Sequence, residues 1–317
     1  MAVSSDQNIK SNIEITGKIL SEISKLAEHG FGKGTVADYI SSLGKVNPNQ
    51  YGLAVVYRNG DIVEAGNSGT RFSIQSVSKL FTLTLAMRLV GPELWTRVHR
   101  NPSMDRFNSV SDLENNNGIP GNPFVNAGAI VVSDAIASRS AAPNRIVLDF
   151  MRTLSGQNDL YVDQQVALDE AETGHRNFAL AYLLKDYGNI SNKVDDVLSL
   201  YFRHCAIEMS CTELAQAALY LANDGVDPKS GQRIVSAEET RELNALLVTS
   251  GMYNSSGEFA FRVGLPAKSG VSGGILAIVP QRMAICVWSP ELDTNGNSVV
   301  GQLILEYLTQ KLGISVF

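Results

Sequence analysis

The chain has few of the residues from which metal sites and disulfide frameworks are built. Its 317 residues include three cysteines and four histidines. No cysteine pair stands at CxxC spacing and no HExxH or His-x-His pattern occurs, so neither a disulfide framework nor a metal site is indicated. His204 beside Cys205 has only Glu208 one turn away, which favours a surface histidine next to a core cysteine. We expect reduced, buried thiols, no metal and no cofactor.

Long apolar runs and blocks of positive charge are also absent. No stretch approaches the ~18 apolar residues of a membrane span, and the opening MAVSSDQNIK lacks a positive start followed by an apolar segment. The formal net charge of -6, without a basic cluster, argues against a nucleic-acid or anionic-membrane surface. We expect a cytoplasmic protein whose partners are small molecules, not nucleic acid or membrane.

What is present is an ordinary globular composition, 44% hydrophobic and 18% charged. Residues 8–28 carry apolar side chains at helical spacing, and the runs YGLAVVY and DIVEAG around Asn59-Gly60 predict a β-hairpin with a two-residue turn. From about 93 to 225 helical patterns follow one another without a predicted strand. Within this block NNNGIPGNPFVNAG predicts a loop that leads into a helix at Asn126.

The C-terminal part becomes β-rich again. A capping box, SAEE, begins a helix, and the runs EFAFRV, GGILAIVP and RMAICVWS predict strands before a final helix, VVGQLILEYLTQKL. The two ends therefore suit one antiparallel sheet flanked by terminal helices, with a helical lobe inserted between them. We expect an α+β fold in a single domain, 1–317, with a sheet lobe of about 1–74 and 226–317 and a helical lobe of about 75–225.

A Ser-x-x-Lys pair stands at the start of the first helix after the hairpin, in RFSIQSVSKLFTL. Ser76 and Lys79 are three residues apart and therefore neighbours on the helix surface. A serine hydroxyl needs a base to become a nucleophile, and a partly desolvated lysine can serve as one. Most such pairs are plain surface helix, so the interpretation depends on the rest of the chain.

A second motif, Lys268-Ser269-Gly270, lies among the late strands in GLPAKSGVSGG. In Ser-x-x-Lys acyl-transfer enzymes a Lys-Ser/Thr-Gly triplet lines the site, where the lysine supplies positive potential and nearby N–H groups approach the substrate. The alternative is a glycine-rich β-turn with an exposed lysine. Both motifs, in this order, favour the β-lactamase and penicillin-binding-protein fold, also called transpeptidase-like.

Several long runs carry a more specific resemblance. FSIQSVSK, GIPGNPFVNAGAIV, EAETGHRN, SGMYNSSGEFAFRVGLPAKSGVSGGILAIVP and VWSPELDTNGNS resemble the serine-dependent glutaminases of the β-lactamase-like superfamily, over nearly the whole chain. The resemblance implies hydrolysis of L-glutamine to L-glutamate and ammonia through an acyl-enzyme on Ser76, with Lys79 as base. It also implies a homotetramer, which no sequence feature by itself demonstrates.

The resemblance further implies the substrate-binding residues: Ser76, Asn126, Glu170, Asn177, Tyr201, Tyr253 and the backbone of Val271. Glu170 can pair with the α-ammonium, while the amides and phenol of Asn126, Asn177 and Tyr201 can bind the carboxylate. Tyr39 is implied less firmly, because relatives follow this tyrosine with Ile-Pro and this chain has Ile40-Ser41. Without the resemblance, Glu170 is a solvated acid, Asn177 a helix cap, and the two tyrosines part of the core.

The implied mechanism has Lys79 take the Ser76 proton, the N–H groups of Ser76 and Val271 hold the oxyanion, and Tyr253 relay a proton to ammonia. Two alternatives stay open. One is a penicillin-recognising serine hydrolase or esterase of the same fold. The other is an amino-acid-binding protein without catalysis, which an intact Ser76, Lys79 and Tyr253 disfavours.

Overall fold

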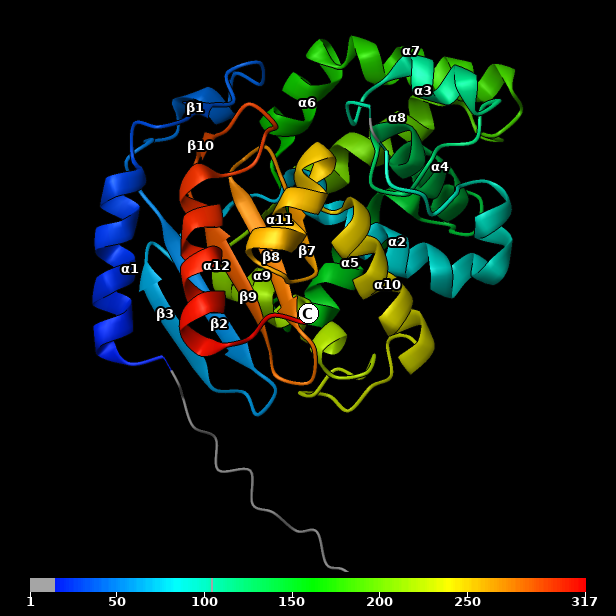
Figure 1. The fold of residues 1–317 in the computed structure, drawn as a ribbon. Helices are drawn as coiled ribbons and strands as arrows, with labels where there is room; N and C mark the ends of the chain where they lie inside the picture. The colour runs from blue at the N-terminus through cyan, green and yellow to red at the C-terminus, as the bar shows by residue number, and fades with distance from the viewer. Residues whose placement is uncertain (1–14, 104) are drawn as a thin grey trace, which may run out of the picture.

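The two ends of the chain meet in one antiparallel sheet (Figure 1). The computed structural model describes residues 15–103 and 105–317, so positions 8–14 of the predicted first helix lie outside the described residues. The pairing of β2 with β9 joins the N-terminal hairpin to the C-terminal strands, which confirms the predicted shared sheet. In spatial order the strands are β3 (Ile62–Gly66), β2 (Gly52–Tyr57), β9 (Met283–Trp288), β8 (Gly274–Val279) and β7 (Ala267–Ser269).

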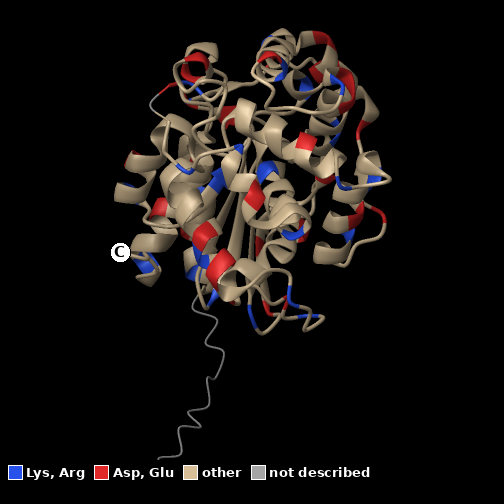
Figure 2. Cartoon of the chain, turned by 90° about the vertical axis from the view of Figure 1, so that its right-hand side faces the viewer, with Lys and Arg blue, Asp and Glu red and all other residues tan. Residues whose placement is uncertain are grey.

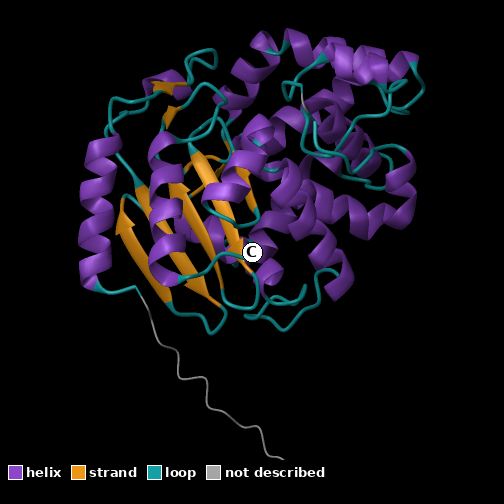
Figure 3. Cartoon of the chain, viewed as in Figure 1, coloured by secondary structure: helices purple, strands orange, loops and turns teal. Residues whose placement is uncertain are grey.

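Both terminal helices pack on the same face of this sheet. Helices α1 (Gly17–Gly30) and α12 (Val299–Leu312) lie side by side across it (Figure 3). Strand β2 is buried on both faces. Its residues alternate, with Leu53 and Val55 in the core beneath the terminal helices and Ala54 and Val56 in the core on the opposite side. The period of two therefore assigns each β2 side chain to one of two cores.

The opposite face carries the helices of the central block. Helix α2 (Ser78–Val90) lies in their midst, its residues buried from Ser78 to Met87, and it ends at Gly91 with a φ of 68°. Around it lie α3 (Val110–Asn115), α4 (Asn126–Ala137), α5 (Pro143–Ser155), α6 (Gln164–Thr173), α7 (His175–Asp186), α8 (Val194–Cys205) and α9 (Cys211–Ala217). Helix α10 (Ala237–Ser250) begins at the predicted capping box.

The prediction of no strand between about 93 and 225 is wrong. Strands β5 (Tyr161–Val162) and β6 (Ile207–Met209) form a small sheet with β4 (Phe72–Ser73). Strands of two or three residues are too short to show a period of two, and their pairing comes from partners distant in sequence. Because β4 leads directly into the Ser76 turn, this small sheet anchors the turn. A further pair, β1 (Thr35–Val36) with β10 (Glu291–Leu292), lies above the main sheet.

The predicted strand EFAFRV is also wrong, because the segment forms helix α11 (Ser256–Arg262). Its two phenylalanines, two residues apart, imitate strand alternation. Phe259 and Val263, four residues apart, are buried together in the core beneath the terminal helices, whereas Phe261 is 88% exposed. Residues four apart lie on the same face of a helix, so the joint burial of Phe259 and Val263 favours a helix over a strand.

The hairpin is confirmed, but its loop has four residues, from Arg58 to Asp61, and not two. Short 3₁₀ segments connect several elements: η1 (Leu43–Lys45), η2 (Gln75–Val77), η3 (Gly91–Thr96), η4 (Leu219–Ala222) and η5 (Tyr253–Ser255). The α+β class is confirmed, while the lobe boundaries stay predictions.

Acidic and basic residues are interspersed over the molecule in Figure 2, and in residues 15–103 and 105–317 no helix is long and apolar enough to cross a bilayer.

Candidate active site

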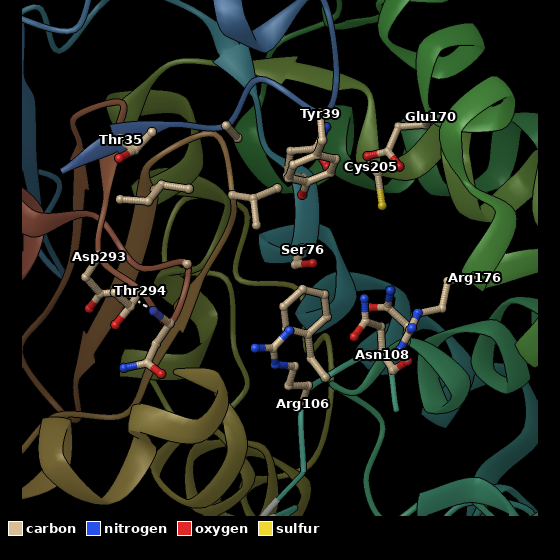
Figure 4. Close-up of a pocket in the computed structure, with 18 of the residues that line it drawn as sticks. Thr35, Tyr39, Ser76, Arg106, Asn108, Glu170, Arg176, Cys205, Asp293 and Thr294 are labelled. Carbon is tan, nitrogen blue, oxygen red and sulfur yellow. Dashed lines mark hydrogen bonds between the residues drawn. The ribbon is translucent and has the colours of Figure 1, made fainter. Parts of the chain in front are cut away.

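A pocket of about 1040 Å³ collects residues from distant parts of the chain (Figure 4). Its walls come from the β1 segment, η2, residues 106–108, the facing parts of α6 and α7, and residues 292–296. Seven of the predicted site residues line it: Tyr39, Ser76, Asn126, Glu170, Asn177, Tyr201 and Val271. Lys79 and Tyr253 lie behind this wall, buried and in contact with it.

Ser76 lies in the short 3₁₀ turn that runs directly into α2, and in Figure 4 it occupies the centre of the pocket. The Lys-Ser-Gly strand passes close to this turn. A Cβ atom on Gly270 would lie 2.8 Å from the backbone oxygen of Ile74. Only a residue without a side chain allows this approach, which gives the glycine of the triplet a physical reason.

Lys79 is fully enclosed, with 1% of its surface exposed. Its Nζ donates to Asn126 Oδ1 at 2.6 Å and to Phe124 O at 3.2 Å, and within the described part of the chain it makes no hydrogen bond to Ser76. Burial lowers the pKa of Lys79 to about 8 from its usual 10.5. A substantial fraction of this amine is therefore neutral near pH 8.

Tyr253 connects the turn to the late strands. Its phenol lies near Ser76, which lowers the pKa of the phenol, and its Oη donates to Ser269 O at 3.4 Å. Burial raises the pKa of Tyr253 to about 12, so the phenol keeps its proton. Lys268 lies behind it, with its Nζ 4.4 Å from the tyrosine ring centroid and donating to Gly251 O and Ser269 O. This lysine is buried, so the alternative of an exposed turn lysine is wrong.

Glu170 occupies the opposite side of the pocket from the Lys-Ser-Gly strand, on α6, a helix that the sequence patterns missed. Burial raises the pKa of its carboxyl to about 7, while a hydrogen bond from Gln75 and the nearby Lys79 act in the opposite direction. Glu172, two residues later, is exposed. The pocket therefore contains a carboxyl group that has lost much of its hydration without gaining a full ion pair.

The predicted asparagines are linked to each other. Asn126 Nδ2 donates to Asn177 Oδ1 at 2.8 Å, while the Oδ1 of Asn126 accepts from Lys79. Asn126 thus has a contact that the sequence did not indicate: its side-chain carbonyl accepts from Lys79 and orients the amine. Tyr201 of α8 is 3% exposed, and its ring centroid lies 5.8 Å from Lys79 Nζ.

Several pocket residues were not predicted. Gln75 precedes Ser76 and contacts Glu170; Phe107 packs on Tyr253 with ring centroids 4.8 Å apart; Arg106 and Arg176 lie at the rim in Figure 4. Gln75 and Arg176 each adjoin a predicted site residue in sequence, Ser76 and Asn177, which is the signal that could have indicated them. Arg106 and Phe107 come from a segment without a periodic pattern, so the fold identifies them.

The histidine and cysteine predictions have different outcomes. His204 is 1% exposed, so the expectation of a surface histidine is wrong: its helix is covered on this side by α4 and the Ser76 turn. The three cysteines are free and buried, as expected, and Cys205 also lines the pocket. Burial raises the pKa of the Cys205 thiol to about 12.

Known proteins resemble this chain in sequence and in fold. The Glutaminase family model matches residues 34–317. A glutaminase from a Marinomonas species is 50% identical over 299 residues, covering 94% of this chain and 99% of the relative, and one from Vibrio parahaemolyticus is 49% identical over 310 residues, covering 98% and 100%. The chain belongs to the glutaminase family.

Solved structures agree with this membership. The probable glutaminase YbaS superimposes with a TM-score of 0.89 at 35% identity, covering 95% of this chain and 99% of that protein. The Bacillus subtilis glutaminase YbgJ, solved as a covalent complex with 5-oxo-L-norleucine, gives 0.84 at 32% identity over 94% and 98%. The expected β-lactamase-like fold and the expected class of enzyme, an amidohydrolase, are confirmed.

Proposed function

We propose that this protein hydrolyses L-glutamine to L-glutamate and ammonia through an ester on Ser76, with Lys79 as the base. The observation that carries the proposal is the hydrogen bonding of the buried lysine. A neutral amine has two N–H donors and one lone pair. The two N–H groups of the neutral amine match the two acceptors, Phe124 O and Asn126 Oδ1. The lone pair is then available to accept the proton of Ser76, one helical turn away.

The acylation step follows from this arrangement. Lys79 removes the hydroxyl proton as Ser76 Oγ attacks the side-chain amide carbon of the substrate. The backbone N–H groups of Ser76 and Val271 stabilise the oxyanion that forms. Tyr253, next to Ser76 and still protonated, passes its proton to the departing ammonia and takes back the proton that Lys79 removed. Lys79, neutral again, then accepts a proton from the water that cleaves the ester, and this proton returns to Ser76 Oγ. Substrate binding completes the alignment, since catalytic hydrogen bonds commonly tighten at that point.

The other end of the pocket supports recognition of an α-amino acid. Glu170 pairs with the α-ammonium, and Asn177 and Tyr201 bind the carboxylate. Asn126 contributes its free N–H while its carbonyl holds Lys79. The Bacillus subtilis relative reacts with 6-diazo-5-oxo-L-norleucine, an α-amino acid of similar length, which supports the same orientation here. Tyr39, beside Glu170 in Figure 4, closes the pocket from above.

A coupled assay tests the function. Purified protein is incubated with L-glutamine while ammonia and glutamate are measured, and the two products should appear in equal amounts. Failure to release either product would reject the proposal. Incubation with a fluorescent penicillin, followed by mass analysis of Ser76, tests the alternative serine hydrolase, which would form a stable adduct.

Assembly and location are separate parts of the proposal. We expect a homotetramer, since closed symmetric assembly is common among soluble enzymes, and a cytoplasmic location, in keeping with the three free cysteines. Light scattering at micromolar concentration and fractionation of cells measure these two properties. A monomer, or recovery outside the cytoplasm, would contradict them.

A further inference from the structure

Gln75, directly before the proposed nucleophile, has a backbone conformation that residues with a side chain rarely adopt. Its φ is 48°, in the left-handed region. Glycine would adopt it without steric cost, but here the side chain has a role: it lies beside Glu170 in the pocket lining and lowers the pKa of that carboxyl, and Nε2 donates to Ser73 Oγ at 3.4 Å. A conformation of this kind persists only where the surroundings over-determine it.

Ser78 supplies the nearest of these constraints. Its Oγ donates to the backbone oxygen of Gln75 at 2.6 Å, and its backbone N–H points to the same oxygen. On the other side, Ser78 Oγ lies 2.8 Å from Nδ1 of His204, which belongs to α8. Ser78 therefore connects the strained residue to a helix that also carries Tyr201.

His204 is held in turn by a second contact. Its Nε2 lies 3.3 Å from Ser133 Oγ on α4, the helix that begins at Asn126. The ring meets Tyr201 edge-on, with centroids 5.2 Å apart at 83°. The imidazole thus links the Ser76 turn to α4 and α8, the two helices that supply Asn126 and Tyr201.

The contacts also assign the protons of this network. Burial lowers the pKa of His204 to about 3, so the ring is neutral and carries one N–H. The hydroxyl proton of Ser78 goes to Gln75 O, so Ser78 Oγ accepts and His204 donates from Nδ1. Nε2 faces Ser133 Oγ at 3.3 Å, and the Ser133 hydroxyl donates to Ala129 O at 2.9 Å.

We propose that Ser78 and His204 are positioning residues for glutamine hydrolysis. They hold Gln75 in its left-handed conformation, which presents Ser76 to the pocket and directs the Gln75 amide to Glu170. One network thereby sets both the nucleophile and the partner of the substrate ammonium. This inference rests on the proposed function, and its test includes a readout that does not depend on glutamine.

Steady-state kinetics of two variants give the first test. Ser78→Ala and His204→Leu should each lower kcat/KM roughly 10- to 100-fold, since a displacement of about 1 Å can cost that much. The loss should appear both as a lower kcat, from the misplaced serine, and as a higher KM, from the released Glu170. The double variant should be little worse than the poorer single variant, because the two residues act as one unit.

Two further variants separate positioning from stability. His204→Asn keeps an amide N–H near the place of Nδ1 and should recover activity to within about 5-fold of wild type. Ser155→Ala removes an equally buried hydroxyl, whose Oγ donates to Met151 O at 2.8 Å on α5, and should leave kcat and KM within about 2-fold. Thermal unfolding of every variant shows whether each is folded at the assay temperature.

A fluorophosphonate probe, which labels nucleophilic serines, gives the readout without glutamine. Slower labelling of Ser76 in Ser78→Ala than in Ser155→Ala supports the inference, even if wild type releases no ammonia and the proposed function fails. If wild type hydrolyses glutamine and Ser78→Ala keeps wild-type kcat and KM, the inference is overturned. Equal labelling in the two variants, including none in either, overturns it as well.

Discussion

The two ends of the pocket are built in different ways. The end that we propose for the reaction consists of Ser76, Lys79 and Tyr253, the first two from one helical turn. The end that we propose for the amino-acid group consists of Glu170, Asn177 and Tyr201, one residue from each of three successive helices, α6, α7 and α8. Local chain geometry therefore fixes the Ser76–Lys79 pair of the first end, whereas tertiary packing brings in Tyr253 and all three residues of the second.

Burial has the same physical effect at both ends but opposite consequences for function. Loss of hydration favours the neutral form of any ionisable group. It lowers the pKa of Lys79 to about 8, which yields the free base, and raises the pKa of Glu170 to about 7, which works against the carboxylate. In the proposed mechanism the neutral base is therefore present before the substrate binds, whereas the Glu170 carboxylate becomes fully charged only when it pairs with the substrate ammonium.

The largest expected effect is at the reaction end. Ser76→Ala should lower kcat roughly 10⁴-fold or more, as the loss of a nucleophile does in other serine hydrolases, while circular dichroism shows an intact fold. Ammonia release measures the loss. Activity within a few-fold of wild type would remove Ser76 from the mechanism.

Lys79→Ala should come close to this loss, because the serine then has no base for its proton. The step lost is acylation, so rapid-quench experiments should find no covalent intermediate with glutamine. Detection of an acyl-enzyme at the wild-type rate would show that another group takes the proton.

Glu170→Gln tests the amino-acid end. It keeps the shape of the side chain but leaves the ammonium without its counter-charge, a loss of about 2 to 5 kcal/mol for a buried pair. This corresponds to roughly 30-fold to several-thousand-fold in kcat/KM at about 1.4 kcal/mol per decade.

The exposed Glu172 is the matched control for this variant. Glu172→Gln should change kcat/KM only slightly. A glutamine analogue without the α-amino group should be poor for wild type and lose little more in Glu170→Gln. If Glu172→Gln is the damaging change, the ammonium site is assigned two residues out of register.

A smaller effect concerns pH. Lys79 is active when neutral, above about pH 8, and Glu170 when charged, above about pH 7. Wild-type kcat/KM should therefore fall as the pH drops below about 8, where Lys79 becomes protonated. The fall should become steeper below about pH 7, where Glu170 is protonated as well. In kcat, which reports the complex, the Glu170 step should disappear, since bound ammonium keeps the carboxylate charged. A kcat/KM independent of pH in folded protein would contradict this.

The smallest effect is expected at Cys205. Its thiol lines the pocket, but burial raises its pKa to about 12, so almost no reactive thiolate exists near neutral pH. Iodoacetamide should leave glutaminase activity essentially unchanged, as residual activity and intact mass will show. Rapid inactivation that Cys205→Ala prevents would indicate an unexpectedly reactive thiol.

The sequence predicts the two ends of the pocket unequally. Ser76 and Lys79 become candidates from a spacing of three on one helix, which needs no tertiary information, although the spacing gains weight only with the Lys268-Ser269-Gly270 motif and the resemblance. Glu170 follows only from resemblance, because its helix has no clear pattern and an isolated glutamate is most often solvated. Gln75, Phe107 and the buried His204 have no sequence signal of this kind, and the strand predicted at EFAFRV shows how a period of two can mislead where a helix packs at a spacing of four.

By itself, the sequence determined the α+β class, the terminal helices, the hairpin and the Ser-x-x-Lys turn. These features depend on periodicity, turn chemistry and neighbours a few residues apart, which are local properties of the chain. Only the tertiary structure decided that β2 pairs with β9, that α6, α7 and α8 supply part of the pocket wall, and that Lys79 is buried and Glu170 partly buried. The protonation of these two groups is a property of burial, and burial arises only when segments far apart in the sequence pack together.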